Sequence, residues 1–131
     1  MKRSDISKSN SSLEKYRKQC QKIVSISNSI RYAGIINEYG RTISGRIKPG
    51  VKPLFSPNQV RTEFSAIVTA AKLREKSLTA IGKSNYIILN HKKVIILLLQ
   101  NRKITYYVTF DQESIPTKAI IEKIQTISTE E

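Results

Sequence analysis

Hydrophobic residues recur along this chain at two spacings, one typical of helices and one typical of strands. An apolar residue at every third or fourth position predicts amphipathic helices over residues 12–27 and 57–79, and a last helix after Ser114. Short alternating or continuous apolar runs predict five strands, at residues 30–37, 41–48, 86–89, 94–99 and 104–110. The expected order is therefore helix, two strands, helix, three strands, helix.

The middle helix has the clearest start in the sequence. Ser56 can cap it, Pro57 suits the first helical position, and Gln59 completes a capping box. Gly82 lies near the expected end, where a glycine commonly terminates a helix. These signals place the expected helix at residues 57–79.

The run VIILLL at residues 94–99 determines the expected layers. It does not alternate, so both faces of this strand should be buried. The short turns between successive strands require antiparallel pairing. The sequence therefore predicts an α/β fold of the α+β kind: a three-layer sandwich with a five-stranded, mainly antiparallel sheet, helices on both faces, and the order α-β-β-α-β-β-β-α. Gly34 and Gly45, inside two expected strands, indicate close packing of a bulky group or a bulge.

The length and composition are those of one globular domain, since 131 residues are 39% hydrophobic and 25% charged. We expect a disordered basic leader at residues 1–11, a single domain at 12–128 and an acidic tail at 129–131. The longest purely apolar run, 94–99, is too short to span a bilayer, so no transmembrane segment is expected. The single thiol, Cys20, fits a reducing compartment and predicts a cytoplasmic protein.

Residues 30–54 carry a distinctive series of short motifs. IRYAGIIN (30–37) is followed by Gly40, ISG (43–45), KPGV (48–51) and PL (53–54). Together with the element order, these motifs resemble the roadblock/dynein light chain group, within the wider profilin-like and longin-like set, and more narrowly an archaeal family of that architecture. The resemblance covers about residues 12–127, and its motifs are not catalytic signatures.

The resemblance implies a roadblock-like cytoplasmic scaffold that forms a homodimer and binds a small Ras-like GTPase or another regulatory or signalling protein. Dimers of this group commonly join their sheets edge to edge and pair their middle helices. For this sequence, that implies contacts through the strand 85–90 and the helix 57–79. The implied dimer-interface residues are Tyr86, Ile88, Phe64 and Val68. The high basicity departs from the better-known relatives.

Residues that could support catalysis are few and dispersed. The only histidine, His91, lies in an expected turn beside Lys92 and Lys93, and the 10 acidic residues are scattered along the chain. One histidine and one cysteine are too few for a structural zinc site. The five glycines are too far apart to form a phosphate-binding loop. We therefore expect no enzyme, no cofactor, and no catalytic, cofactor-binding or metal-binding residue.

Charge is the composition feature that most suggests a partner. Lys and Arg number 23 against 10 Asp and Glu, which gives a formal net charge of +13. Such a charge attracts phosphate backbones or anionic lipid, although it also serves solubility alone. The candidate basic partner-binding face comprises Lys15, Arg17, Lys18, Lys22, Arg41, Arg46, Lys48 and Lys52.

The sequence leaves three functional hypotheses, of which a non-enzymatic scaffold or regulatory interaction module comes first. The first alternative is a nucleic-acid-binding protein without sequence specificity that uses the basic face. The second alternative is a small-ligand sensor, with room for the ligand beside Gly34 and Gly45.

Overall fold

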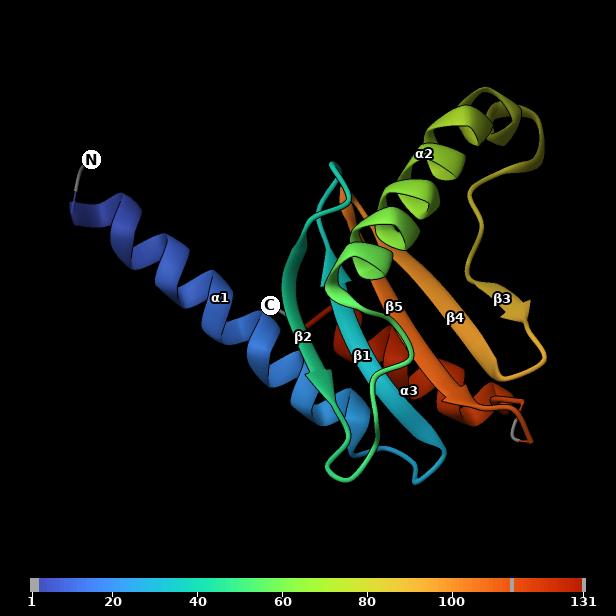
Figure 1. The fold of residues 1–131 in the computed structure, drawn as a ribbon. Helices are drawn as coiled ribbons and strands as arrows, with labels where there is room; N and C mark the ends of the chain where they lie inside the picture. The colour runs from blue at the N-terminus through green and yellow to red at the C-terminus, as the bar shows by residue number, and fades with distance from the viewer. Residues whose placement is uncertain (1–2, 114, 131) are drawn as a thin grey trace.

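The computed structural model describes residues 3–113 and 115–130, and the side chains of residues 11–113 and 115–130. Three helices and five strands follow one another in the expected order (Figure 1). Their bounds are α1 (Arg3–Val24), β1 (Ile30–Ile36), β2 (Thr42–Ile47), α2 (Pro57–Ile81), β3 (Ile87–Asn90), β4 (Val94–Asn101), β5 (Ile104–Asp111) and α3 (Lys118–Ser128).

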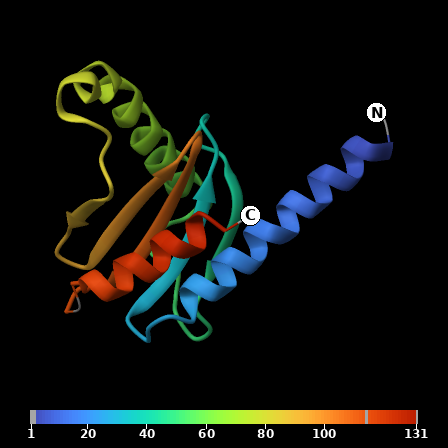
Figure 2. The ribbon, with the colours of Figure 1, turned by 180° about the vertical axis from the view of Figure 1, so that it is seen from behind.

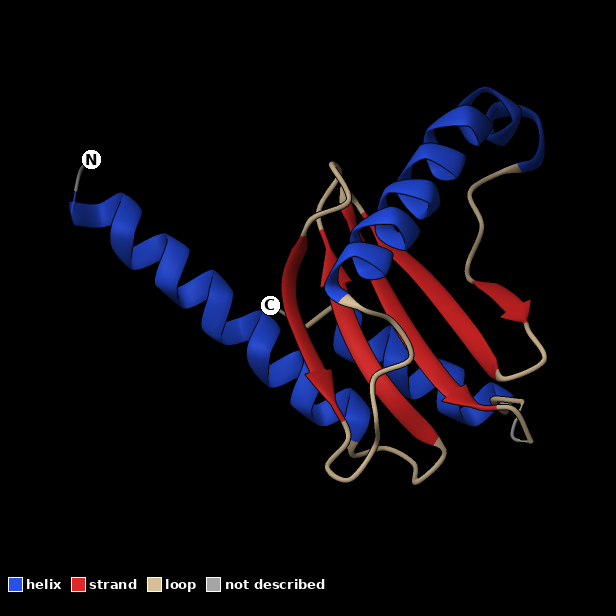
Figure 3. Cartoon of the chain, viewed as in Figure 1, coloured by secondary structure: helices blue, strands red, loops and turns tan. Residues whose placement is uncertain are grey.

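The five strands form one sheet with the order β2-β1-β5-β4-β3 (Figure 3). Every neighbouring pair is antiparallel, so the sheet consists of the β1–β2 hairpin and the β3–β4–β5 meander, joined side by side through β1 and β5. Gly34 on β1 lies between Gly45 on β2 and Tyr107 on β5. This register brings the two glycines together on neighbouring strands.

Helices cover both faces of the sheet, which confirms the predicted three-layer sandwich. Helices α1 and α3 pack on one face and α2 packs on the other (Figures 1 and 2). The interior strand β4 contributes to both layers, as its continuous apolar run predicts. Ile95, Leu97 and Leu99 join the α1/α3 cluster, whereas Val94, Ile96 and Leu98 join the α2 cluster.

A buried polar network ties α1, α3 and β5 together within the α1/α3 layer. The Tyr106 hydroxyl donates to Gln19 Oε1 at 2.6 Å, and Gln19 Nε2 donates to the carbonyl of Ile127 at 2.9 Å. These two hydrogen bonds satisfy the polar atoms of Gln19 inside the core.

The thiol of Cys20 is buried in the same layer. Cys20 is 1% exposed, as its place on the apolar stripe of α1 predicts, and burial raises the pKa of its thiol.

Helix α1 begins at Arg3, whereas the sequence analysis expects a disordered leader until residue 11. Residues 3–11 contain neither glycine nor proline, so helical hydrogen bonding can continue past Ser11 without an interruption. Ser11 consequently lies inside the helix. Figure 1 shows this part of α1 extending away from the sheet. The domain boundaries at residues 12 and 128 stay predictions.

The two other helices begin with side-chain caps. Ser56 and Gln59 form the predicted reciprocal capping box of α2, and Gly82 follows its last residue with φ 84°. Helix α3 is capped by Thr117, whose hydroxyl accepts from the Ile120 amide. Ser114, after which the sequence predicts this helix, lies outside the described residues.

Candidate interaction surfaces

Helix α2 buries little of its length against the sheet. Of its 25 residues only Phe64 and Val68 are buried, and its C-terminal half extends beyond the strands (Figure 1). Leu73 is 79% exposed and Ile81 is 69% exposed. A surface helix normally turns its large apolar residues toward the core, so these two side chains form an unusual exposed apolar surface on α2.

The exposed apolar residues of α2 belong to one uncharged stripe on its outer face. The spacing of the stripe, four, three, four and four residues, keeps its members on one side of a helix. All of them are exposed: Ala66, Ala70, Leu73, Ser77 and Ile81, named here the outer stripe.

Strand β3 forms an edge of the sheet, and this edge is open. It pairs with β4 on one side and, among the described residues, with no strand on the other. Tyr86 is 45% exposed and Ile87 is 36% exposed. The segment 82–86 leads directly from the projecting end of α2 to β3 (Figure 1). An open apolar edge is a template for another strand.

Two of the four dimer-interface residues inferred from the resemblance are buried within the protomer. Phe64 is 2% exposed and Val68 is 8% exposed, because the inner face of α2 presses both against the sheet. The Phe64 ring lies 4.9 Å from the ring of Tyr107 on β5. Tyr86 is exposed and Ile88 is half-buried toward the α1/α3 cluster.

The sequence analysis misses the outer stripe, although a signal for it exists. Alongside the large apolar residues of the inner face, α2 carries a second row of small and apolar residues free of charge. This second row is visible in the sequence of α2 as the spacing of Ala66, Ala70, Leu73, Ser77 and Ile81.

The eight candidate basic residues do not share one face of the molecule. Helix α1 carries Lys15, Lys18 and Lys22 on a common side, and Arg46 joins this side of the sheet because its strand partner is Ala33 of the α1/α3 cluster. By contrast, Arg41 and Lys52 line hollows on the α2 side.

Several of these cations already have partners within the protein. Arg17 lies 3.6 Å from Glu14, and Lys22 lies 3.0 Å from Glu130. The Lys48 ammonium donates to the carbonyl of Ser27. Exposed ion pairs of this kind are weak and leave the charges available to water or a ligand.

On the α2 side, Tyr32 covers the two strand glycines. A Cβ atom at Gly34 would lie 2.6 Å from Tyr32 Oη, and one at Gly45 would lie 2.5 Å from it. The glycines therefore make room for a bulky side chain, as their place inside strands predicts. Burial raises the pKa of Tyr32 to about 12, so its hydroxyl is protonated at neutral pH.

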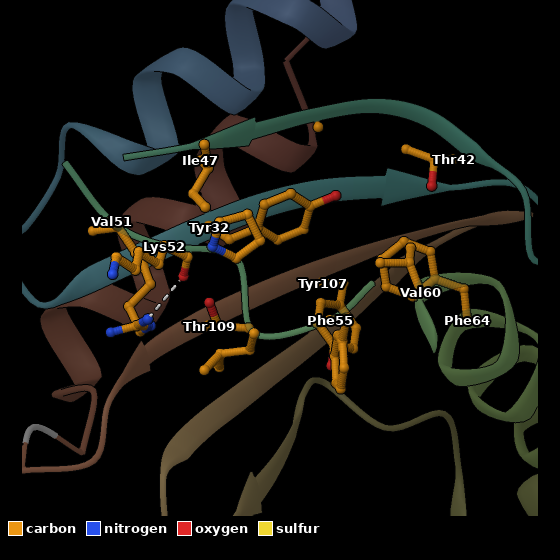
Figure 4. Close-up of a pocket in the computed structure, with 14 residues that line it drawn as sticks. Tyr32, Thr42, Ile47, Val51, Lys52, Phe55, Val60, Phe64, Tyr107 and Thr109 are labelled. Atoms are coloured by element: carbon orange, nitrogen blue, oxygen red, sulfur yellow. Dashed lines mark hydrogen bonds between the residues drawn. The ribbon is translucent and has the colours of Figure 1, made fainter. Parts of the chain in front are cut away.

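A pocket of about 410 Å³ opens beside Tyr32 (Figure 4). Its floor is the sheet surface of β2, β1 and β5, and its walls are the loop 48–56 and the first turns of α2. Next to it, the Tyr107 hydroxyl donates to Glu63 Oε2 at 2.6 Å. Burial and this carboxylate together raise the pKa of Tyr107.

The histidine and the acidic residues do not form a cluster in the described part of the chain. His91 is exposed in the turn between β3 and β4, where its amide bonds the carbonyl of Val94. Within residues 3–113 and 115–130, no three His, Cys, Asp or Glu side chains gather as metal ligands would. None of the described helices combines the length and apolar character that crossing a membrane requires.

Solved structures with the same architecture include several bacterial proteins. The gliding protein MglB from Thermus thermophilus superposes with a TM-score of 0.71 at 11% identity, over 88% of this chain and 86% of that one. A roadblock/LC7 domain from Streptomyces avermitilis superposes with a TM-score of 0.64 at 9% identity, over 85% and 88%. The chain has the roadblock/LC7 fold.

A third structure with this fold is an MglB with a tetrameric arrangement, which has a TM-score of 0.67 at 14% identity over 88% of each chain. No protein-family model matches the sequence, and no curated protein matches it either. At these identities the likeness establishes the roadblock/LC7 fold.

Proposed function

We propose that this protein is a non-enzymatic scaffold or regulatory module that works in the cytoplasm as a homodimer and docks a small GTPase or another signalling protein. The observation that carries the proposal is the outer stripe of α2 beside the open edge of β3. Each is an incomplete surface, and a second copy of the chain can complete both.

The geometry of the outer stripe suits helix-to-helix packing. Ala66 and Ala70 are small enough to let a second helix approach closely, while Leu73 and Ile81 supply large apolar side chains that need covering. A two-fold axis beside β3 would also bring two β3 edges together and extend the sheet across both copies. The tetrameric arrangement of one MglB supports association as a property of this fold.

Light scattering on the purified protein tests the dimer. The wild-type chain should have the mass of two copies, and Leu73→Asp should shift it to one copy because a charge would be buried in the stripe. Leu13→Asp is the matched control, since Leu13 is also an exposed helical leucine, at 45%, but lies on α1. A wild-type protein that stays monomeric at high micromolar concentration contradicts the dimer.

The partner is tested by affinity capture from native cell extract, with and without nuclease. A nucleotide-binding protein that is retained after nuclease treatment, and is lost with Leu73→Asp, supports the proposal. Capture that disappears with nuclease instead favours the alternative of a nucleic-acid partner.

That alternative rests on the basic side of α1. Lys15, Lys18 and Lys22 project from one side of the helix, and Arg46 lies on the same side of the sheet. Binding of a fluorescent single-stranded oligonucleotide should weaken steeply with salt because neutralised phosphates release counterions. Lys15→Glu with Lys18→Glu should reduce this binding far more than the matched pair Lys92→Glu with Lys93→Glu. The absence of binding at low salt excludes this alternative.

A further inference from the structure

The two halves of the α2-side sheet surface are covered differently. Phe64 and Val68 of α2 lie over the part formed by β5 and β4, where Val94, Ile96 and Leu98 complete the cluster. On β1, Ile36 belongs to the same cluster, whereas the parts of β1 and β2 around Tyr32 and Ile47 face the loop 48–56, which runs from β2 to the start of α2. The pocket of about 410 Å³ lies between the loop 48–56 and the first turns of α2.

We propose that this pocket binds a small molecule with an apolar, aromatic-sized body and one anionic group, held by Lys52. The inference goes beyond the proposed function, because neither a dimer nor a protein partner requires a ligand at this position. Strand β3 lies at the opposite edge of the sheet from β2, and the outer stripe is on the exposed face of α2, so the two surfaces can be tested separately.

The size and lining of the pocket fit a small molecule. Ligand sites usually measure roughly 300–1,000 Å³ and combine an apolar lining with a few polar groups. Here Val51, Leu54 and Phe55 form the loop wall, and Val60 and Phe64 form the helix wall. Leu54 is 46% exposed, so apolar surface at this wall remains uncovered in the protein itself.

The polar groups at the pocket select an anion. Its lining includes two cations, Arg31 and Lys52, and no acidic residue. The Arg31 guanidinium donates to Asp111 at 3.1 Å and to the carbonyl of Lys52 at 3.3 Å, so its charge is partly offset and it anchors the loop. Lys52 is exposed and makes no ion pair within the described residues. Its ammonium is therefore the cation available to a ligand.

Hydroxyl groups complete the site on the sheet side. The Tyr32 ring lies along the strands, with its hydroxyl directed toward Thr42 (Figure 4). Because this hydroxyl is protonated at neutral pH, it can donate a hydrogen bond to a ligand. Thr109 on β5 adds a second hydroxyl to the floor. These groups can orient a ligand whose charged end faces Lys52.

The test uses two fluorescent probes that share one aromatic body. Anilinonaphthalene sulfonate carries an anionic group, and N-phenylnaphthylamine is its neutral counterpart. The chain contains no tryptophan, so the wild-type titration is free of overlapping protein emission. The sulfonate should bind at one site per chain and more tightly than the neutral probe. Equal affinity of the two probes overturns the anionic part of the proposal.

Amide NMR spectra locate the bound sulfonate. On addition of the sulfonate, the protein's amide signals should shift at Gly45, Val51 and Thr109, which surround the pocket. The amide signals of Leu73 and Ile81 should not shift. Shifts confined to Leu73 and Ile81 overturn the proposal, because the probe then binds the outer stripe. Binding should persist in Leu73→Asp, which separates the pocket from the dimer.

Two variants, each with a matched control, test whether Lys52 holds the anionic group and whether the probe occupies the pocket. Lys52→Met should weaken sulfonate binding about five-fold, as the loss of one partly exposed charge contact does, and leave the neutral probe unaffected. Lys123→Met, the same change on α3 at the opposite face, should leave both unchanged. Ile47→Trp fills the pocket from β2 and should abolish binding of both probes, whereas Ile115→Trp should not. Unchanged binding in Lys52→Met or in Ile47→Trp overturns the site.

Discussion

The two faces of the sheet differ in how completely they are covered. On one face, α1 and α3 seal the sheet with residues that include Ile23 and Ile124, both 0% exposed, and with the hydrogen-bonded Gln19. On the other face, α2 buries only Phe64 and Val68 and leaves a pocket on one side and an exposed stripe on the other. The same sheet therefore has one closed side and one open side.

This difference suggests a division of labour within the fold. Burial of apolar area is the main source of stability, so the closed side should contribute most of the free energy of folding. Uncovered apolar surface lowers solubility unless something binds it, so the open side is where partners or ligands are expected. The comparison can be tested by substitutions matched across the two sides.

The largest expected effect is on the closed side. Ile124→Ala should lower the free energy of unfolding by about 3 kcal/mol, because it removes a fully buried side chain and leaves a cavity. Leu73→Ala on the outer stripe, 79% exposed, should change it by less than about 0.5 kcal/mol. Both are measured by denaturant unfolding, below the concentration at which copies associate. Similar losses in the two variants would contradict the division of labour.

The sequence predicts buried strands and locally capped helix ends best. The unbroken run VIILLL predicts a strand buried on both faces, and β4 is buried on both faces. The reciprocal cap of Ser56 and Gln59 is local, so spacing alone identifies it. Buried elements and local caps are predictable because few alternative arrangements satisfy the same pattern.

The open side is predicted less well because it depends on what lies outside the protomer. The inner and outer stripes of α2 are both apolar enough to be buried, and the resemblance selects Phe64 and Val68, which face inward. The pocket depends on the path of the loop 48–56, whose proline and glycine signals predict turns but not their position over the sheet. One feature of the closed side also escapes prediction: the helical start at Arg3, because the first residues of α1 carry no apolar periodicity.

An intermediate effect is expected where Tyr32 covers the strand glycines on the open side. Gly34→Ala should lower the free energy of unfolding by about 2 kcal/mol, because the new methyl group would lie 2.6 Å from Tyr32 Oη and displace the ring. Gly34 is buried, so the strand cannot easily move away. Thermal or denaturant unfolding measures this loss.

The control is the same substitution in a Tyr32→Ala background. Without the ring, the three atoms nearest to the alanine methyl are gone, and the lower backbone entropy of alanine in the unfolded chain should make Gly34→Ala neutral or slightly stabilising. A reversal of sign between the two backgrounds would establish that Tyr32 is the reason for the glycine. Equal losses in both would show that the backbone itself requires glycine.

The smallest expected effects compare two adjacent tyrosines on β5 that face opposite sides. Tyr106→Phe should cost about 1.5 kcal/mol, because Gln19, 2% exposed, would keep a buried amide oxygen without its donor. Tyr107→Phe should cost about 1 kcal/mol or less, because Glu63 is only half-buried and its carboxylate can turn toward water. Denaturant unfolding of the two single variants measures both losses. A larger loss for Tyr107→Phe would mean that the Glu63 contact holds α2 on the sheet as firmly as the buried network holds α1 and α3, and the open side would then be as rigidly built as the closed one.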